Sequence, residues 1–217
     1  MGTRARGIAA MTGIVAAALA ATAGSASADE APPQPSFTAQ ADLDGNGTPE
    51  TVTITKSGDN TQDLSATIDG KTVHTSMPGN GFAGDVSPLR VADFNGDGAS
   101  DLVVKYSVGA NTDWFGVWDF DGTGFRQLTT PDGKALTLNE GGGLATRTGY
   151  ACADVPNREL SSVAAEADDI SQDPITYTGS RTTYRVQDGI ATPQRTMDLK
   201  SVPSADPLVS PNPDTCG

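Results

Sequence analysis

The sequence contains two copies of an acidic, glycine-rich loop, 51 residues apart. Residues 41–50 read Ala-Asp-Leu-Asp-Gly-Asn-Gly-Thr-Pro-Glu and residues 92–101 read Ala-Asp-Phe-Asn-Gly-Asp-Gly-Ala-Ser-Asp, so the two copies align without a gap. Each loop runs into a strand-like segment, which alternates apolar and hydroxyl residues over 50–55 and is more continuously apolar over 101–106. A repeat of this period indicates several copies of one supersecondary unit. We therefore predict a chain built from repeated groups of short β-strands.

Three Asp-Gly pairs, at 69–70, 121–122 and 188–189, lie between strand-like segments and predict tight hairpin turns. The third pair belongs to a degraded copy that keeps an Ala-Asp start at 153–154. The repeat units are thus expected near residues 37–88, 89–149 and 150–200. Segments 114–118 and 182–186 are also strand-like, and 161–168 suits either a short helix or a strand. With 25 Gly and 14 Pro, long helices are not expected.

The first 28 residues have the pattern of a signal peptide. Arg4 and Arg6 precede an apolar run over 8–23, and Ala26-Ser27-Ala28 offers the small residues that a signal peptidase reads. The alternatives are a membrane anchor or a buried helix, but the run is too short and too rich in Ala to span a bilayer comfortably. We expect a secreted protein without stable membrane insertion, followed by a flexible arm over 29–36. The net charge of −13 argues against nucleic-acid binding.

The chain has two cysteines, Cys152 and Cys216. In an exported protein an even count favours a disulfide, and there is no C-x-x-C pair that would indicate redox catalysis. The bridge would attach a Pro-rich C-terminal tail to the rest of a single domain over 37–217.

Both acidic loops follow the pattern D-x-[DN]-G-[DN]-G-x-x-[DE], which places oxygen side chains at positions 1, 3, 5 and 9 around one point. The glycines allow the tight backbone that this arrangement needs, and position 7 would add a carbonyl oxygen. Hard oxygen donors suit Ca²⁺, whereas Zn²⁺ would require His or Cys. The alternative is that these are ordinary turn residues, but three carboxylates so close together would repel one another without a cation. The predicted ligands of two Ca²⁺ ions are Asp42, Asp44, Asn46, Thr48 (carbonyl) and Glu50 in the first loop, and Asp93, Asn95, Asp97, Ala99 (carbonyl) and Asp101 in the second.

These loops, each followed by a hydrophobic strand, resemble the FG-GAP/VCBS repeats of integrin α-chain β-propellers and of secreted bacterial proteins, including actinobacterial ones. The resemblance implies an all-β fold of short antiparallel sheets in about three propeller-blade-like repeats, with calcium in the loops. At about 50 residues a blade, the chain is too short for a seven-bladed propeller. Glu50 replaces the usual final Asp, so we expect the second site to be the tighter one.

The function expected from this resemblance is that of a secreted calcium-binding β-repeat module for adhesion or cell-envelope interaction, with an unknown protein or polysaccharide ligand. The alternative is a secreted hydrolase or enzyme inhibitor whose site follows no recognisable motif. Asp119 and Asp121 could form a glycosidase carboxylate pair, but they lie at a predicted turn. His74, the only histidine, is expected at an exposed strand position. The aromatic cluster over 114–125 is expected in the core, with the alternative that part of it lines a ligand surface.

Overall fold

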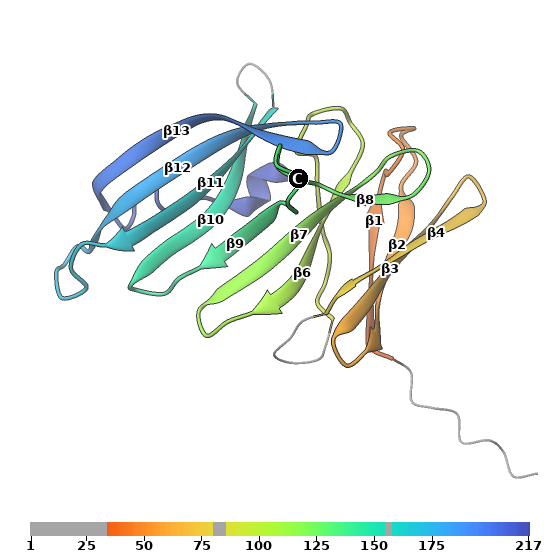
Figure 1. Cartoon of the computed structure of the whole chain (residues 1–217), viewed down its shortest axis with the longest axis horizontal. Helices are drawn as coiled ribbons and strands as arrows, with labels where there is room; N and C mark the ends of the chain where they lie inside the picture. The colour runs from red at the N-terminus through yellow and green to blue at the C-terminus, as the bar shows by residue number, and fades with distance from the viewer. Residues whose placement is uncertain (1–33, 80–85, 155–157) are drawn as a thin grey trace, which may run out of the picture. The chain divides into compact units, whose positions relative to one another are not determined.

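The computed structural model describes residues 34–79, 86–154 and 158–217, and nearly all of its regular structure is antiparallel β-sheet (Figure 1). The predicted signal peptide lies outside the described residues. The elements are β1 (Ser36–Ala41), β2 (Glu50–Gly58), β3 (Thr61–Ile68), β4 (Lys71–Pro78), β5 (Arg90–Ala92), β6 (Asp101–Val108), β7 (Thr112–Phe120), β8 (Phe125–Gln127), β9 (Thr137–Gly141), β10 (Thr146–Asp154), β11 (Arg158–Ala167), β12 (Thr176–Gln187), β13 (Ile190–Pro203) and the 3₁₀ helix η1 (Pro213–Cys216).

The strands form two sheets, which confirms the all-β, antiparallel prediction. The first has four strands in the order β1-β2-β3-β4 and coincides with the first repeat unit. The second has nine, in the order β13-β12-β11-β10-β9-β7-β6-β5, with β8 also paired to β7. The second and third repeat units therefore share one sheet, where the sequence suggested a sheet for each. The reason is β9, which pairs with β7 through Leu138 and Phe115 and with β10 through Gly141 and Thr148.

The burial of the strands follows the sequence pattern. Val52 and Ile54 of β2 are buried while the hydroxyl residues between and beside them are not, as expected for a strand with one face in the core. Leu102, Val103 and Val104 of β6 are all buried, so this strand is covered on both faces, as its continuous apolar run predicted. The ambiguous segment 161–168 forms most of β11.

All three Asp-Gly pairs make hairpin turns. Asp69 and Gly70 have φ of 50° and 76° between β3 and β4, and Asp188 and Gly189 have φ of 51° and 76° between β12 and β13. Positive φ at both central residues is the geometry that matches the twist of the flanking strands. The pair at 121–122 lies in a longer turn, closed by a backbone hydrogen bond from the Asp121 N–H to the Gly124 carbonyl oxygen.

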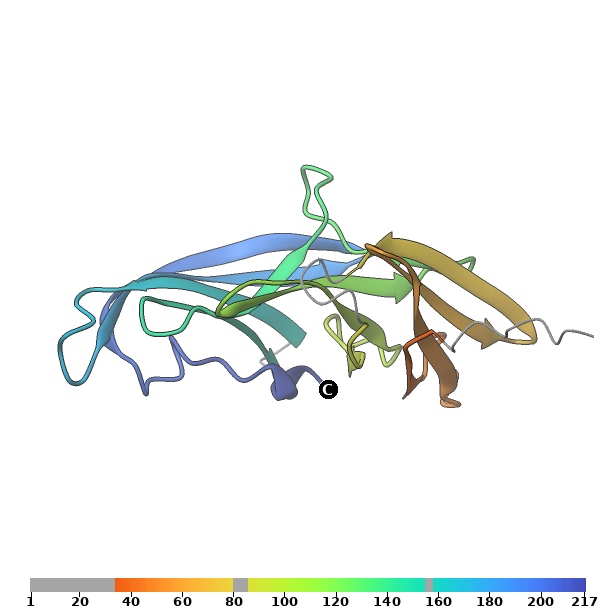
Figure 2. The ribbon, with the colours of Figure 1, turned by 90° about the horizontal axis from the view of Figure 1, so that it is seen from below.

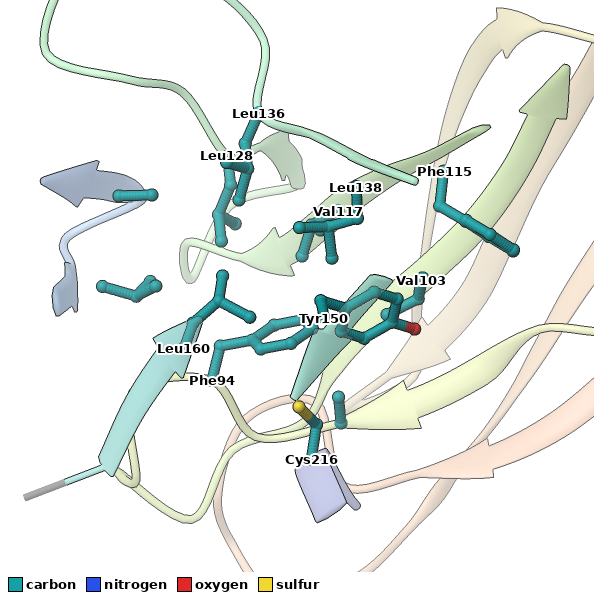
Figure 3. Close-up of a cluster of buried hydrophobic side chains, with 13 residues drawn as sticks. Phe94, Val103, Phe115, Val117, Leu128, Leu136, Leu138, Tyr150, Leu160 and Cys216 are labelled. Carbon is teal, nitrogen blue, oxygen red and sulfur yellow. The ribbon is translucent and has the colours of Figure 1, made fainter. Parts of the chain in front are cut away.

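Two main hydrophobic cores lie on opposite faces of β6 and β7. One face packs with the four-stranded sheet and includes Leu43, Ile54, Leu64, Leu102 and Trp118. The other face packs with strands and loops of the third repeat and with η1; it includes Phe94, Val103, Phe115, Tyr150 and Cys216 (Figure 3). A third, smaller core forms between β11, β12, β13 and the C-terminal tail, which runs beneath the sheet (Figure 2).

Both ends of the described domain are held against its sheets. Cys152 and Cys216 form a disulfide with Cα atoms 4.8 Å apart, which confirms the predicted pairing. At the other end, the predicted flexible arm stops earlier than expected, because Ser36 already belongs to β1 and pairs with Thr55. The Pro35 carbonyl also accepts a hydrogen bond from the Lys56 N–H. The long strand β2 thus pairs with residues 35 and 36, which composition alone assigns to a linker.

Candidate metal centre

The two acidic loops occupy the same position in their repeats. Residues 42–49 connect β1 to β2, and residues 93–100 connect β5 to β6, so each loop joins an edge strand to the second strand of a meander. In the third repeat, β10 and β11 are adjacent antiparallel strands, and Asp154 at the end of β10 is the strand-register partner of Arg158 at the start of β11. The repeat predicted from sequence is therefore a repeat of topology as well.

The first loop curls around the side chain of Asp42. Its two carboxylate oxygens accept hydrogen bonds from the N–H groups of Asn46, at 3.0 Å, and Gly47, at 2.7 Å. Asp44 also accepts from the Asn46 N–H, and the Asn46 side chain accepts from the Thr48 N–H. Gly45 and Gly47 have φ of 71° and 85°, the left-handed conformation that glycine adopts without strain.

The second loop repeats this arrangement. Asp93 accepts from the N–H groups of Gly96 and Gly98, and Asp97 accepts from the Ala99 N–H. Asn95 stands where the first loop has Asp44, and its side chain accepts from the Asp97 N–H. The glycines have φ of 75° and 87°, within a few degrees of their counterparts. The sequence-predicted ligands thus occur in one backbone geometry, found twice.

The final carboxylate of each loop is fixed by a backbone N–H from position 2. Glu50 Oε2 accepts from the Leu43 N–H at 2.9 Å, and Asp101 Oδ2 accepts from the Phe94 N–H at 2.8 Å. Leu43 and Phe94 are buried, each in a different one of the two main cores. Each loop is therefore anchored by a buried apolar residue at position 2. The side chain of this residue packs in a core, and its backbone N–H holds the carboxylate at position 9.

The first loop brings its three carboxylates together. Asp42, Asp44 and Glu50 each have an oxygen within 4.8 Å of the other two, and no other group of three acidic, His or Cys residues in the described part of the chain is so close. All three side chains are half-buried. Hard oxygen donors that converge at this separation on a pre-shaped backbone fit a Ca²⁺ ion, which takes several oxygen ligands at about 2.3–2.6 Å.

In the second loop the charge is buried rather than clustered. Asp101 is only 2% exposed. Burial raises its pKa to about 7, the Phe94 N–H opposes this rise, and the charges of Asp119, Asp93 and Asp97 add to it. A carboxylate in such surroundings is stabilised in its charged form by an adjacent cation. The second loop therefore also fits a bound cation, although its three carboxylates do not meet at the distance seen in the first.

The loops lie side by side, and their contacts involve residues that the sequence analysis did not single out. The Ser100 N–H of the second loop donates to the Asp42 carbonyl oxygen at 2.7 Å. On its other side, Arg158 Nε donates to the Asp93 carbonyl oxygen at 2.7 Å and Nη2 to the Thr215 carbonyl oxygen at 3.2 Å. The sequence analysis missed this contact, because no local pattern relates Arg158 to a loop 65 residues earlier in the chain.

The alternative catalytic residues have ordinary structural roles. Asp119 is paired with Arg126, whose Nε lies 3.0 Å from its Oδ1. Asp121 accepts hydrogen bonds from Thr123 and Gly124 within its turn, and these bonds lower its pKa. His74 is exposed on β4, as expected. These positions give no constellation for hydrolysis.

No family model, curated protein or solved structure matches the chain. Within the described residues, no helix has the length and hydrophobicity needed to cross a bilayer. Functional inference therefore depends on the loops themselves.

Proposed function

We propose that the protein is a secreted calcium-binding β-repeat module, with one Ca²⁺ in each acidic loop. The observation that carries this proposal is the convergence of the Asp42, Asp44 and Glu50 carboxylates within 4.8 Å of one another. The matching hydrogen-bond pattern of the second loop supports a second site of the same kind.

Bound calcium would offset the repulsion among the carboxylates and so stabilise the loops. Since each loop joins an edge strand to its neighbour, ordering the loop also holds the edge strand in its sheet. The contact from Ser100 to Asp42 would transmit this stabilisation between the repeats. The ion in this proposal has a structural role, and the chain's own residues hold it without any chemical step.

A module stabilised in this way suits the calcium concentrations outside cells, where dissociation constants of about 10⁻⁴ to 10⁻³ M are typical. The resemblance to FG-GAP/VCBS repeats, the signal-peptide pattern of residues 1–28 and the disulfide agree with that setting. We propose an adhesion-type or cell-envelope partner, protein or polysaccharide, on the same resemblance.

Thermal unfolding tests the proposal. At a hundredfold excess over the dissociation constant, Ca²⁺ should add about 2.7 kcal/mol per site, if it binds only the folded chain. For a domain of this size that is a rise in Tm of about 5–11 °C per site. Mg²⁺ should do less, because it requires smaller and stricter octahedral geometry.

A matched pair of double variants separates site binding from general charge effects. Asp42→Ala with Asp44→Ala should lose the part of the calcium shift that belongs to the first loop. The control is Glu166→Ala with Asp198→Ala, which removes two exposed strand carboxylates and should keep the full shift. An equal calcium shift in all three proteins would mean that the first loop is only a turn, and no shift in any of them would mean that neither loop is a calcium site.

A further inference from the structure

Each acidic loop contains an asparagine that is followed directly by a glycine, Asn46-Gly47 in the first loop and Asn95-Gly96 in the second. Asparagine is one of the chemically labile residues of proteins. It loses its side-chain amide when the peptide nitrogen of the next residue attacks its Cγ, and glycine, which has no Cβ, hinders that nitrogen least. The two asparagines stand at different loop positions, 5 and 3, so a common environment for them does not follow from the alignment of the loops.

In both loops the glycine nitrogen that would attack donates a hydrogen bond to a carboxylate. The Gly47 N–H donates to Asp42 Oδ2 at 2.7 Å, and the Gly96 N–H donates to Asp93 Oδ1 at 2.6 Å. A carboxylate at this distance can accept the proton while the nitrogen forms its new bond, which is the geometric requirement for a general base. The Asp at position 1 of each loop is therefore placed to activate the attacking atom.

The side-chain carbonyl that would be attacked is held over the same nitrogen. Asn46 Oδ1 accepts from the Thr48 N–H at 2.7 Å, and Asn95 Oδ1 accepts from the Asp97 N–H at 3.0 Å. Each bond reaches past the glycine to the residue after it, so the asparagine side chain folds over the peptide nitrogen in between. The same N–H would stabilise the negative charge that develops on Oδ1 during the attack, as the donors of an oxyanion hole do.

The amide nitrogen that would leave also has a carboxylate partner. Asn46 Nδ2 donates to Asp44 Oδ2 at 2.9 Å, and Asn95 Nδ2 donates to Asp97 Oδ2 at 2.8 Å. The attacking nitrogen, the attacked carbonyl and the leaving group thus have the same three kinds of partner in both loops. Groups that are held in place before a reaction starts avoid much of its entropic cost.

We propose that Asn46 and Asn95 are sites of self-catalysed deamidation and that bound Ca²⁺ protects them. The glycine nitrogen forms a bond to Cγ and closes a cyclic succinimide. Its proton passes through the carboxylate at position 1 to the side-chain amide nitrogen, and the bond from Cγ to that nitrogen breaks to release ammonia. One water molecule then opens the ring and leaves either Asp or isoaspartate. The reaction needs no oxidant, reductant or second protein.

Calcium opposes this reaction because it takes the groups that the reaction uses. Asn46 and Asn95 are predicted ligands through their side-chain oxygens, and the Asp at position 1 of each loop is a predicted ligand as well. Protection by calcium rests on the proposed function, whereas acceleration by the fold does not. A loop without the ion gains a carboxylate at one ligand position or, in the isoaspartate product, an extra methylene group in its backbone.

The assay compares three samples at neutral pH: the folded protein with chelator, the folded protein with calcium, and the protein unfolded in urea. Peptide mass spectrometry follows each asparagine separately, and incubation in ¹⁸O-labelled water marks the new carboxylate oxygen. In urea the rate at each Asn-Gly pair depends on local sequence alone. We expect Asn46 and Asn95 to react at least about 10-fold faster in the folded protein with chelator than in urea, within the roughly 10²- to 10⁴-fold that a positioned general base contributes in enzymes. Calcium should slow both.

A variant and a matched control identify the group that activates the nitrogen. Asp93→Asn keeps the shape of the side chain but removes its charge, so Asn95 should slow to its rate in urea while the first loop keeps its own rate. The control is Asp121→Asn, which makes another Asn-Gly pair. The side chain at this position already accepts from the Thr123 N–H, but among the described residues no carboxylate accepts from the Gly122 N–H. This pair should react no faster in the folded protein than in urea.

The proposal is overturned if Asn46 and Asn95 react no faster in the folded protein with chelator than in urea, because the hydrogen bonds would then restrain the side chains rather than activate them. An unchanged rate at Asn95 in Asp93→Asn would also overturn it. Fast reaction that calcium does not slow would support self-catalysed deamidation and contradict protection by the ion.

Discussion

The disulfide between Cys152 and Cys216 should contribute strongly to stability and should also support the second acidic loop. Its ends are 64 residues apart in sequence. In the chain-entropy model, closing a loop of that length in the unfolded chain corresponds to about 4 kcal/mol. The double variant Cys152→Ala with Cys216→Ala should therefore lower the free energy of unfolding by about 2–5 kcal/mol, the range found for native disulfides in small secreted domains.

The link to the loop comes from the backbone around the bridge. The Asp93 N–H donates to the Cys216 carbonyl oxygen at 2.8 Å, and the Cys152 N–H donates to Thr215 Oγ1 at 2.9 Å. When the tail is released, Asp93 loses a backbone partner while Asp42 does not. Calcium binding at the second loop should therefore weaken more than binding at the first, which the tail reaches only through the contact of Ser100 with Asp42.

Urea unfolding of the oxidised protein and of the double variant measures the first effect, with reduced wild-type protein as a control that should match the variant. Calcium titration of the folded variant measures the second. A loss below about 1 kcal/mol would contradict the first part of the reasoning, since it would fall short of the model by a wide margin. Equal weakening at both loops would contradict the second.

Three further predictions follow from other parts of the chain. Burial raises the pKa of Tyr150 to about 12, so the contribution of this tyrosine to stability should be complete below pH 10 and lost as the pH rises toward 12. The variant Tyr150→Phe should lack this loss of stability. It should also lack the late step in a spectrophotometric tyrosine titration. A single tyrosine step at the ordinary pKa in the wild type would contradict this. The secreted protein should begin at Asp29, which its intact mass will show, and retention of residues 1–28 in a soluble mature form would refute the signal-peptide reading. Replacing Asp93 and Asp97 by Ala should reduce the calcium-induced rise in Tm more than replacing Asp42 and Asp44. The second loop is expected to bind calcium more tightly, because Asp101 reaches inward on a shorter side chain than Glu50. The reverse order would show that the clustering of the carboxylates determines calcium affinity more than the length of the side chain at position 9.

The local features of the fold could be predicted because short-range patterns determine them. The alternation over 50–55 and the apolar run over 101–106 gave strands with the expected burial, and each Asp-Gly pair gave a turn because positive φ suits these residues. The gapless alignment of the two loops predicted matching backbone geometry, which the glycine φ values and hydrogen bonds confirm.

The arrangement of the repeats could not be predicted in the same way. Whether the second and third repeats form separate sheets depends on β9, a five-residue strand that pairs on both sides through a few long-range contacts. The contact of Arg158 with the second loop joins residues 65 positions apart. No local pattern specifies such partners, because many segments of similar polarity could compete for the same edge.

Calcium calorimetry tests the central claim most directly. The wild-type protein should bind two Ca²⁺ ions per chain. The double variant Asp42→Ala with Asp44→Ala should bind one, and so should Asp93→Ala with Asp97→Ala. The variant that combines all four substitutions should bind none. If the wild type gives no calcium-binding heat at concentrations up to about 10⁻² M, well above the dissociation constants of extracellular sites, or if the stoichiometry is the same in all four proteins, then the acidic loops are not calcium sites.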